Sequence, residues 1–387
     1  MIDEKILSIL EKEKNRQQED HVFIASENFA SPDVAKLVGS VFSNKYCEGY
    51  PGRRYYNGCD NFDDLESYGN SLVQKLYGCN FANIQPHSGA NANLAVYKAL
   101  LKPGDTTLGM NLTDGGHLSH GSRANISGQW FEPHFYAVDN EGFLNYDNIY
   151  KQAKKIKPKL IIAGASAYPR QIDWAAFRDI ANAVSSYLVV DMAHYSGLIA
   201  AGVYDNPMQY ADIVTSTTHK TLRGARGGMI LWNNPRLTRQ INSAVFPGVQ
   251  GGPLMNQIAG KIQAFYEALD PDFRQYGKNV IRASKLIASV LRDKGITPIT
   301  GGTDSHIVLI PTLYCSGREV ANTLEQKYRI IVNKNTIPND TRTVVETSGI
   351  RIGTAAAVTR RGFDEKYFID IANKISEVIL TYPDLKG

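Results

Sequence analysis

Lys220 is a single lysine that follows a short apolar segment and a row of hydroxyl side chains. The surrounding sequence, residues 213–228, reads IVTSTTHKTLRGARGG. Desolvation and neighbouring cations lower the pKa of a lysine, and the neutral amine is the nucleophile that forms a Schiff base with a carbonyl. The hydroxyls before Lys220 could bind a phosphate, and the glycines after it would let the backbone lie close to a flat ring. Taken alone, Lys220 also fits a solvated lysine at the end of a strand.

Asp191 stands at the end of another apolar segment, LVVDMAH at residues 188–194. A buried carboxylate is costly unless it is paired, so an aspartate here needs a partner. An aspartate that faces a pyridinium nitrogen keeps the nitrogen protonated and makes the ring an electron sink, as pyridoxal phosphate requires. A helix N-cap or a structural salt bridge would explain Asp191 alone. Asp191 and Lys220 together, at the ends of successive strands, indicate a pyridoxal phosphate site more specifically than either residue does.

Two glycine-containing loops could contribute further groups to such a site. Residues 87–93, HSGANAN, open a predicted helix whose free backbone amides suit a phosphate, and an ordinary N-cap is the alternative. Residues 114–121, DGGHLSHG, place His117 and His120 in one loop. An imidazole could stack on an aromatic ring there. A metal site would need further ligands that the neighbouring sequence does not contain, and a polar turn is the third interpretation.

A tyrosine-rich stretch and an isolated arginine complete the candidates. Residues 44–56, NKYCEGYPGRRYY, hold four tyrosines, one glutamate and two arginines. This composition predicts either an interface or a lid over a site, with Glu48 as an acid or base. Arg351 lies between apolar residues in SGIRIG, residues 348–353. Its planar fork fits a substrate carboxylate bidentately, and a partly buried structural ion pair is the alternative.

These groups must be positioned by a fold, and the composition of the 387-residue chain limits the possibilities. The length favours two domains. The net charge of +4 is too small to indicate a nucleic acid or an anionic membrane as the partner. The chain contains no run of about 18 apolar residues, which is the length that a membrane-spanning helix needs. Four cysteines without a C-x-x-C pair predict neither a zinc nor a redox site, and the lack of a secretory signal core predicts reduced thiols in the cytoplasm.

Short apolar strands alternate with helical segments through the middle of the chain. Strands are expected at 106–110, 160–163, 187–190, 213–214 and 229–232, and helices at 60–76, 90–101, 146–155 and 174–184. This alternation predicts an α/β fold with a mostly parallel sheet covered by helices on both faces, which binds ligands at the carboxyl ends of its strands. A smaller α+β domain is expected after about residue 271, with helices at 280–294, 317–326 and 364–380 and strands at 306–310 and 330–332. An amphipathic helix at 2–18 predicts an arm that packs on the body or on a partner subunit.

Together these motifs resemble serine hydroxymethyltransferase, a pyridoxal-phosphate enzyme of fold type I, the aspartate-aminotransferase-like fold. The resemblance runs from about residue 23 to the helix after Arg361. It includes IASEN at 24–28, the tyrosine-rich stretch, GGH at 115–117, DMAH at 191–194, TTHK at 217–220, GGP at 251–253, VNKN at 332–335 and SGIR at 348–351. The resemblance implies a seven-stranded sheet, an N-terminal arm at 1–45, a large cofactor-binding domain at 46–270 and a small domain at 271–387. The chain departs from the family pattern at Ala225, where proline is usual, and at 355–357, where three alanines replace a proline-containing segment.

The resemblance implies a role for each matched residue. Lys220 would carry the Schiff base, Asp191 would face the pyridine nitrogen, and His117 would stack on the ring. The other cofactor contacts would come from Ser88, Gly89, Ala90, Ser166, His194 and His219. The substrate carboxylate would be bound by Ser26 and Arg351, and tetrahydrofolate would contact Leu112, Gly116, Leu118 and Asn335. The partner subunit of a homodimer would supply Tyr46, Glu48, Tyr56, Gly251 and Gly252, with Glu48 as the proton-transfer group.

The implied activity is the reversible transfer of a hydroxymethyl group between L-serine and tetrahydrofolate, which gives glycine and 5,10-methylenetetrahydrofolate. Two other interpretations remain open. A folate-independent aldolase of 3-hydroxy amino acids would need Lys220 and Asp191 but neither Asn335 nor the Glu48 segment. A catalytically silent binding protein, for instance one that contacts RNA, would be expected to lack Lys220 or Arg351, and both are present.

Overall fold

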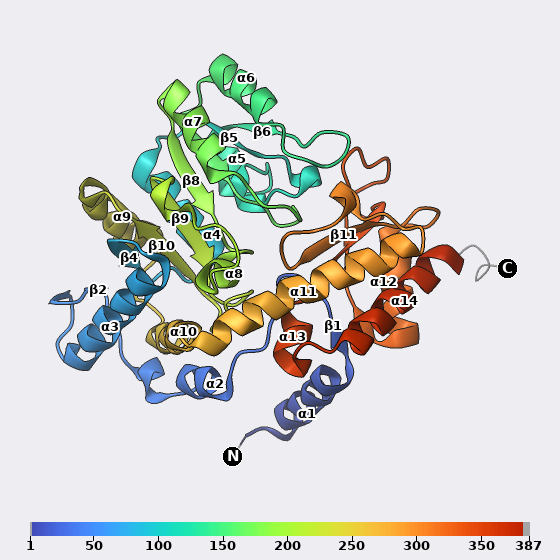
Figure 1. Cartoon of the computed structure of the whole chain (residues 1–387). Coiled ribbons are helices and arrows are strands. Elements are labelled where there is room, and N and C mark those ends of the chain that lie inside the picture. Colours follow the sequence, from blue (N-terminus) through green and yellow to red (C-terminus); the bar gives the residue numbers. More distant parts are fainter. Residues whose placement is uncertain (1, 382–387) are drawn as a thin grey trace.

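The computed structural model describes residues 2–381 and is built around a seven-stranded sheet (Figure 1). Its strands, in spatial order, are β4 (Phe81–Asn83), β10 (Gly228–Trp232), β9 (Ile213–Thr217), β8 (Tyr187–Asp191), β7 (Leu160–Ala163), β5 (Thr106–Met110) and β6 (Glu132–Tyr136). Four of the six neighbouring pairs are parallel, and β10 runs antiparallel to both of its neighbours. The predicted α/β fold with a mostly parallel sheet is confirmed, although β4 and β6 were not among the expected strands.

Side chains of the central strands alternate between two apolar clusters, one on each face of the sheet. Val189 packs in the cluster that contains residues of α4 (Gly89–Leu100). Val190, the next residue along β8, packs in the cluster that contains residues of α3 (Asp60–Tyr77) and α7 (Trp174–Val184). Successive side chains of a strand point to opposite faces, so a strand that is apolar throughout must be covered on both sides. The helices on both faces of the sheet agree with the sequence prediction.

The C-terminal part of the chain contains a second, three-stranded antiparallel sheet. Its strands, in spatial order, are β11 (Ile307–Pro311), β14 (Gly349–Gly353) and β13 (Asn333–Asn335). The long helix α11 (Pro271–Asp293) begins with Asp270 as its N-cap and packs against α14 (Glu365–Thr381). Pro271 suits the first turn, because an N–H at that position would have no helical partner. The start of α11 coincides with the expected domain boundary at 271, and that boundary stays a prediction.

The N-terminal segment joins this C-terminal part. Strand β1 (His21–Val22) pairs in parallel with β12 (Ile330–Ile331). Helix α1 (Glu4–Glu19) has no buried side chain and leaves Ile6 and Ile9 more than half exposed, at 59% and 58%. The body of the same chain therefore does not cover the apolar side of α1. Packing of this arm on a partner subunit stays a prediction.

The remaining elements connect these layers. They are α2 (Pro32–Val38), α5 (Ile126–Trp130), α6 (Tyr146–Ile156), α8 (Ser196–Ala200), α9 (Thr238–Ser243), α10 (Met255–Ala268), α12 (Gly317–Tyr328), α13 (Ala355–Arg361) and the hairpin of β2 (Gly49–Tyr50) and β3 (Arg53–Arg54). The three alanines at 355–357 are buried and begin α13. Within residues 2–381, no helix is long and apolar enough to cross a membrane, and no group of three or more His, Cys, Asp or Glu side chains could hold a metal ion.

Candidate active site

Lys220 lies just beyond the carboxyl end of β9, in a cavity of about 440 Å³. The predicted residues that line this cavity are Ser26, Ser88, Gly89, Ala90, His117, Ser166, Asp191, His194, His219 and Lys220. Lys220 is 8% exposed. Its burial, together with the positive charges of Arg351 and Arg226, lowers the pKa of Lys220 to about 8. A solvated lysine at a strand end is therefore excluded, and the neutral amine becomes accessible close to neutral pH.

Asp191 is the last residue of β8 and pairs with Thr215 of β9, so two adjacent strand ends deliver Asp191 and Lys220 as predicted. One carboxylate oxygen, Oδ2, accepts hydrogen bonds from Asn93 Nδ2 at 2.8 Å and from His120 Nε2 at 3.0 Å. Burial alone would raise the pKa of Asp191, but the hydrogen bond and charge of His120 outweigh it and hold the pKa well below its usual range. His120 and Asn93 are thus the polar partners of the buried Asp191, and an ionised carboxylate stays at the cavity wall.

The first turn of α4 forms another wall of the cavity. Ser88 is the N-cap and accepts a hydrogen bond from the backbone N–H of Asn91 at 3.1 Å. The amides of the first helical residues have no intrahelical acceptor and favour a bound anion. A Cβ atom on Gly89 would lie 2.7 Å from Cγ2 of Thr217, so only glycine lets this turn approach β9 so closely. His219 also faces the cavity, and its buried Nδ1 has no hydrogen-bond partner among the described residues.

Two neutral histidines flank the cavity. Burial, with the charge of His120 adding to it, lowers the pKa of His117 to about 4. The Nδ1 atom of His117 accepts from the backbone N–H of Ser119 at 3.2 Å, which leaves the proton on Nε2. Burial also lowers the pKa of His194 well below its ordinary value, and Lys220 and Arg351 add to the effect. Both rings can therefore contact a flat ligand without a positive charge of their own.

Arg351 is a buried cation without a carboxylate. It lies in the middle of β14, is 9% exposed, and donates to the carbonyl oxygen of Ser166 at 2.6 Å and to Oδ1 of Asn333 at 3.0 Å. No Asp or Glu between residues 2 and 381 forms an ion pair with Arg351, so the alternative of a structural ion pair is wrong. Burial lowers the pKa of Arg351 to about 10, which leaves it charged near neutral pH. An uncompensated buried charge is costly, and a bound anionic group would compensate it.

The residues expected to contact folate lie on two neighbouring loops. Leu112 and Leu118 are 41% and 50% exposed, which is unusual for leucine, and they flank the loop that carries Gly116 and His117. The side chain of Thr336, next to Asn335, donates to the backbone carbonyl of Thr113 at 2.8 Å. This contact brings the two loops together, although neither leucine nor Asn335 lines the Lys220 cavity itself.

A second group of predicted residues lies apart from this cavity. Its members are Tyr46, Glu48, Tyr56, Gly251 and Gly252, and none of them lines the space around Lys220. They do lie against one another: the rings of Tyr46 and Tyr56 meet edge to face at 5.6 Å. A Cβ atom on Gly252 would lie 2.8 Å from Cε1 of Tyr46, and one on Gly251 would lie 3.5 Å from Oε1 of Glu48. Within one chain, the predicted site is therefore divided into two clusters.

Sequence reasoning missed several residues that support the cavity. Asn93 holds Asp191 and in turn accepts from the hydroxyl of Thr215 at 2.6 Å. His120 received no role of its own beside His117, although its spacing three residues after His117 on a short helical turn was an available signal. His306 stacks on His194 at 5.6 Å and donates through Nε2 to the carbonyl oxygen of Ala25 at 3.2 Å. No sequence pattern pointed to His306, which immediately precedes β11 of the second sheet.

An amine, an ionised aspartate and an anion-binding helix start fit the carbonyl, the pyridine nitrogen and the phosphate of pyridoxal phosphate. On this sheet they define the class of pyridoxal-phosphate enzymes of fold type I. The sequence model of serine hydroxymethyltransferase matches residues 1–375. The chain belongs to the serine hydroxymethyltransferase family, whose members are one-carbon transferases.

Curated relatives agree with this assignment over nearly their whole length. The serine hydroxymethyltransferase of Wolbachia pipientis subsp. Culex pipiens is 52% identical over 380 residues, which cover 97% of this chain and 89% of the relative. That of Campylobacter hominis is 48% identical over 379 residues, with 97% and 91% covered. That of a Nitratiruptor species is 50% identical over 379 residues, with the same coverage. These names do not favour the alternative of a folate-independent aldolase.

Proposed function

We propose that this chain catalyses the reversible transfer of the hydroxymethyl group of L-serine to tetrahydrofolate, which gives glycine and 5,10-methylenetetrahydrofolate. The observation that carries the proposal is the shared cavity of Lys220 and Asp191, which come from the ends of adjacent strands. Family membership gives the reaction class, and this cavity is where we place the reaction. Small molecules as the partners and the cytoplasm as the location belong to the same proposal.

Pyridoxal phosphate would be held by residues of the cavity wall. Lys220 would hold it through its amine, and the negative charge of Asp191 would keep a proton on the pyridine nitrogen. The phosphate would be bound by Ser88, Gly89, Ala90 and His219, the ring would lie against His117, and Ser166 and His194 would make the remaining contacts. When bound, this cofactor supplies an electron sink for the bond that breaks at the substrate Cα.

The carboxylate of serine would be bound by Arg351 and Ser26. The guanidinium of Arg351 has no carboxylate partner and lies next to Ser166 of the cavity wall, and its planar fork matches a carboxylate. Ser26 lines the cavity itself. Binding of the carboxylate fixes the orientation of the substrate about its Cα atom. This orientation decides which bond of the Cα atom is aligned for cleavage. Orientation by Arg351 would therefore select the bond that breaks. The lowered pKa of Lys220 would make its neutral amine available to the cofactor.

Proton transfer would come from a second copy of the chain. Because Glu48 does not line the Lys220 cavity of its own chain, we propose a homodimer in which each cavity is completed by the partner. The completing residues would be Tyr46, Glu48, Tyr56, Gly251 and Gly252, which already lie together as one cluster. The carboxylate of Glu48 would hold or accept the proton of the serine hydroxyl oxygen.

Tetrahydrofolate would bind at the rim that joins the two loops. Leu112 and Leu118 offer exposed apolar surface for a ring system, and Gly116 and Asn335 offer polar backbone and amide groups beside it. The hydrogen bond between Thr336 and Thr113 supports this placement, because it holds both loops at one rim. The hydroxymethyl carbon would then leave serine next to the folate that receives it.

Serine labelled at its hydroxymethyl carbon tests the proposal directly. The purified protein, loaded with pyridoxal phosphate, should transfer the label to tetrahydrofolate and release glycine, and glycine release should depend on folate. Equal turnover of 3-hydroxy amino acids without folate would favour the aldolase alternative instead. Borohydride reduction followed by peptide mapping should place the pyridoxyl group on Lys220, and an adduct on another lysine would overturn the assignment of the cavity.

A further inference from the structure

The backbone around Glu48 is fixed on both sides by one guanidinium. The carbonyl oxygens of Cys47 and Gly49 both accept hydrogen bonds from Nη1 of Arg54, at 2.9 Å each. The carbonyl oxygen of Glu48 itself accepts from the backbone N–H of Tyr55 at 3.0 Å. Three successive carbonyl groups are thus hydrogen-bonded, so the peptide groups that flank Glu48 cannot rotate without breaking these bonds.

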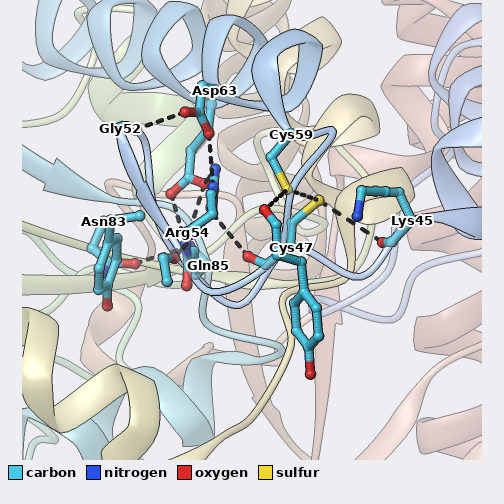
Figure 2. Close-up of polar contacts among 12 residues, drawn as sticks. Lys45, Cys47, Gly52, Arg54, Cys59, Asp63, Asn83 and Gln85 are labelled. Carbon is cyan, nitrogen blue, oxygen red and sulfur yellow. Dashed lines mark hydrogen bonds and ion pairs between the residues drawn. The ribbon is translucent and has the colours of Figure 1, made fainter.

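Arg54 is held in turn by two carboxylates of α3. Its Nε donates to Asp63 at 2.8 Å, and its Nη2 donates to Glu66 at 2.6 Å. The side chains of Arg54 and Glu66 are 3% and 1% exposed. Figure 2 shows Arg54 between Asp63 and the backbone near Cys47, with Asp63 also accepting from the backbone of Gly52. The hairpin of β2 and β3 is therefore bound to α3 through Arg54 and through the backbone of Gly52.

Gln85 links the same cluster to a second segment. Its Nε2 donates to Glu66 at 2.9 Å and to the carbonyl oxygen of Gly49 at 3.0 Å. The backbone carbonyl oxygen of Gln85 accepts a hydrogen bond from Nε2 of Gln250 at 2.9 Å. Gln250 is the residue before the glycine pair at 251–252. Both segments that we assign to the partner's cavity are thus tied to one buried group. We name as the Arg54 cluster the residues Arg54, Asp63, Glu66 and Gln85.

Stability alone is a weak reason for such a cluster. Taking the charges of an arginine and a glutamate out of water is costly, and apolar residues of similar volume often stabilise a protein as well. What the cluster does fix is a tight turn: Gly49 has a φ of +98°, and a Cβ atom there would lie 2.3 Å from the carbonyl oxygen of Arg53. The chain therefore turns closely against Arg54, with the neighbouring Glu48 carboxylate beside Gly251.

We propose that the Arg54 cluster is the positioning device for Glu48, and that it sets the direction from which the Glu48 carboxylate reaches the serine hydroxyl. This inference rests on the proposed function, in which Glu48 transfers a proton. Arg54 touches neither substrate nor cofactor in this arrangement and acts through the backbone of Glu48. Losing the cluster should therefore impair the chemical step more than the binding of serine, whose carboxylate is bound elsewhere.

A double-mutant cycle on the intact, cofactor-loaded protein tests the inference. Arg54→Lys keeps the positive charge, but a single nitrogen cannot reach two carbonyls and two carboxylates. We expect a loss of kcat of about tenfold, because small displacements of a catalytic group are costly, with the KM for serine changed less than about twofold. The variant Arg54→Lys/Glu48→Gln should be no slower than Glu48→Gln alone, because residues that act through one another are not additive.

Arg178→Lys is the matched control. Arg178 also donates to a carboxylate, Asp212 at 2.9 Å, and to a backbone carbonyl, that of Tyr210 at 3.3 Å, but it is not linked to Glu48. The kcat of Arg178→Lys should equal that of the unmodified protein. If the melting temperature shows that Arg54→Lys folds poorly, Gln85→Met replaces it in the test. Gln85→Met removes only the amide donor to Glu66 and Gly49, and it should show the same non-additivity with Glu48→Gln.

The outcomes separate two kinds of failure. An unchanged kcat in folded Arg54→Lys, or a full additional loss on top of Glu48→Gln, would overturn the positioning role while leaving the proposed function intact. An unchanged kcat in Glu48→Gln alone would overturn the proton-transfer role of Glu48 and the positioning inference together.

Discussion

Two buried cations are central to the site at the scale of single residues: Lys220 lines the cavity, and Arg351 donates to the carbonyl oxygen of Ser166 in its wall. Each is nine-tenths or more buried, and the charge of Arg351 contributes to the lowered pKa of Lys220. Asp191 and Glu27 supply two carboxylates to the cavity wall, and Lys220 and Arg226 supply two cations. Arg351, next to Ser166 of that wall, adds a third cation, and the positive excess favours a bound anionic group.

The lowered pKa of Lys220 predicts how pyridoxal phosphate is captured. A pKa of about 8 means that the amine is mostly protonated below pH 8 and mostly neutral above it. Capture by the cofactor-free protein should therefore accelerate as the pH rises through about 8, well below the pKa of about 10.4 of an ordinary lysine. Stopped-flow absorbance between pH 6.5 and 10 measures this rate. A midpoint near 10 would show that Lys220 is not desolvated as described.

Arg351 allows a prediction about substrate affinity. Arg351→Lys keeps the charge but loses the parallel pair of donors, so the dissociation constant for glycine should rise about 100-fold. Equilibrium titration of the cofactor-loaded protein measures this constant. Arg318→Lys, which alters an exposed arginine paired with Glu346, should leave it unchanged. Capture of pyridoxal phosphate by Lys220 should persist in both variants, and an unaltered glycine affinity in Arg351→Lys would contradict carboxylate binding at this position.

At the scale of elements, the site depends on how closely the start of α4 approaches the end of β9. Gly89 and Thr217 meet across this gap, and the turn that follows β9 carries Lys220. The glycine is required by this close approach rather than by an unusual backbone conformation. The anion-binding amides of α4 and the amine of Lys220 thus keep a fixed separation.

Gly89→Ala should weaken cofactor binding without unfolding the protein. The added Cβ would sit 2.7 Å from Cγ2 of Thr217, so either α4 or β9 must shift. We expect the dissociation constant for pyridoxal phosphate to rise about tenfold, the equivalent of about 1.4 kcal/mol. Gly39→Ala is the control, because its nearest neighbour would be an ordinary 3.7 Å away. Equal affinities in both variants would show that the approach of α4 does not matter.

The elements that carry Lys220 and Asp191 could be predicted from the sequence, because in each a short apolar segment is followed by polar residues at the strand end. The same rule placed both side chains at one edge of the sheet. Asn93 and His306 could not be predicted in this way, because they contact the cavity residues Asp191 and His194 from α4 and from the segment before β11. Their contacts depend on how layers pack, and no local pattern encodes that packing.

At the scale of the whole molecule, the division of the predicted site into two clusters is the main result. The sequence pattern, through the family resemblance, assigned both clusters to one reaction. In the described chain Lys220 and Asp191 line one cavity and Arg351 donates to Ser166 of its wall, whereas Glu48 and Tyr56 do not line it. The proposed second copy of the chain would reconcile these facts, and it would also offer a surface to the exposed apolar side of α1.

Mixing two inactive variants tests the shared site. Lys220→Ala and Glu48→Gln should each be nearly inactive as pure proteins. In a randomly exchanged equal mixture, half of the dimers are mixed and each mixed dimer has one intact site, so about a quarter of the sites should be active. Serine turnover before and after subunit exchange measures this recovery. No recovery, with exchange verified by a mass-tagged subunit, would contradict a site built from two chains.

The pairing of β1 with β12 has a consequence for the order of synthesis. His21 and Val22 leave the ribosome among the first residues, but their partners at 330–331 are translated some 300 residues later. Strand β1 therefore stays unpaired while the large sheet is completed. Ser26, only four residues after Val22, reaches its place in the cavity wall only after β1 has paired. A nascent chain that ends before residue 330 should consequently carry a formed sheet and a protease-sensitive N-terminal segment, and its cavity should acquire the Ser26 wall only near the end of translation.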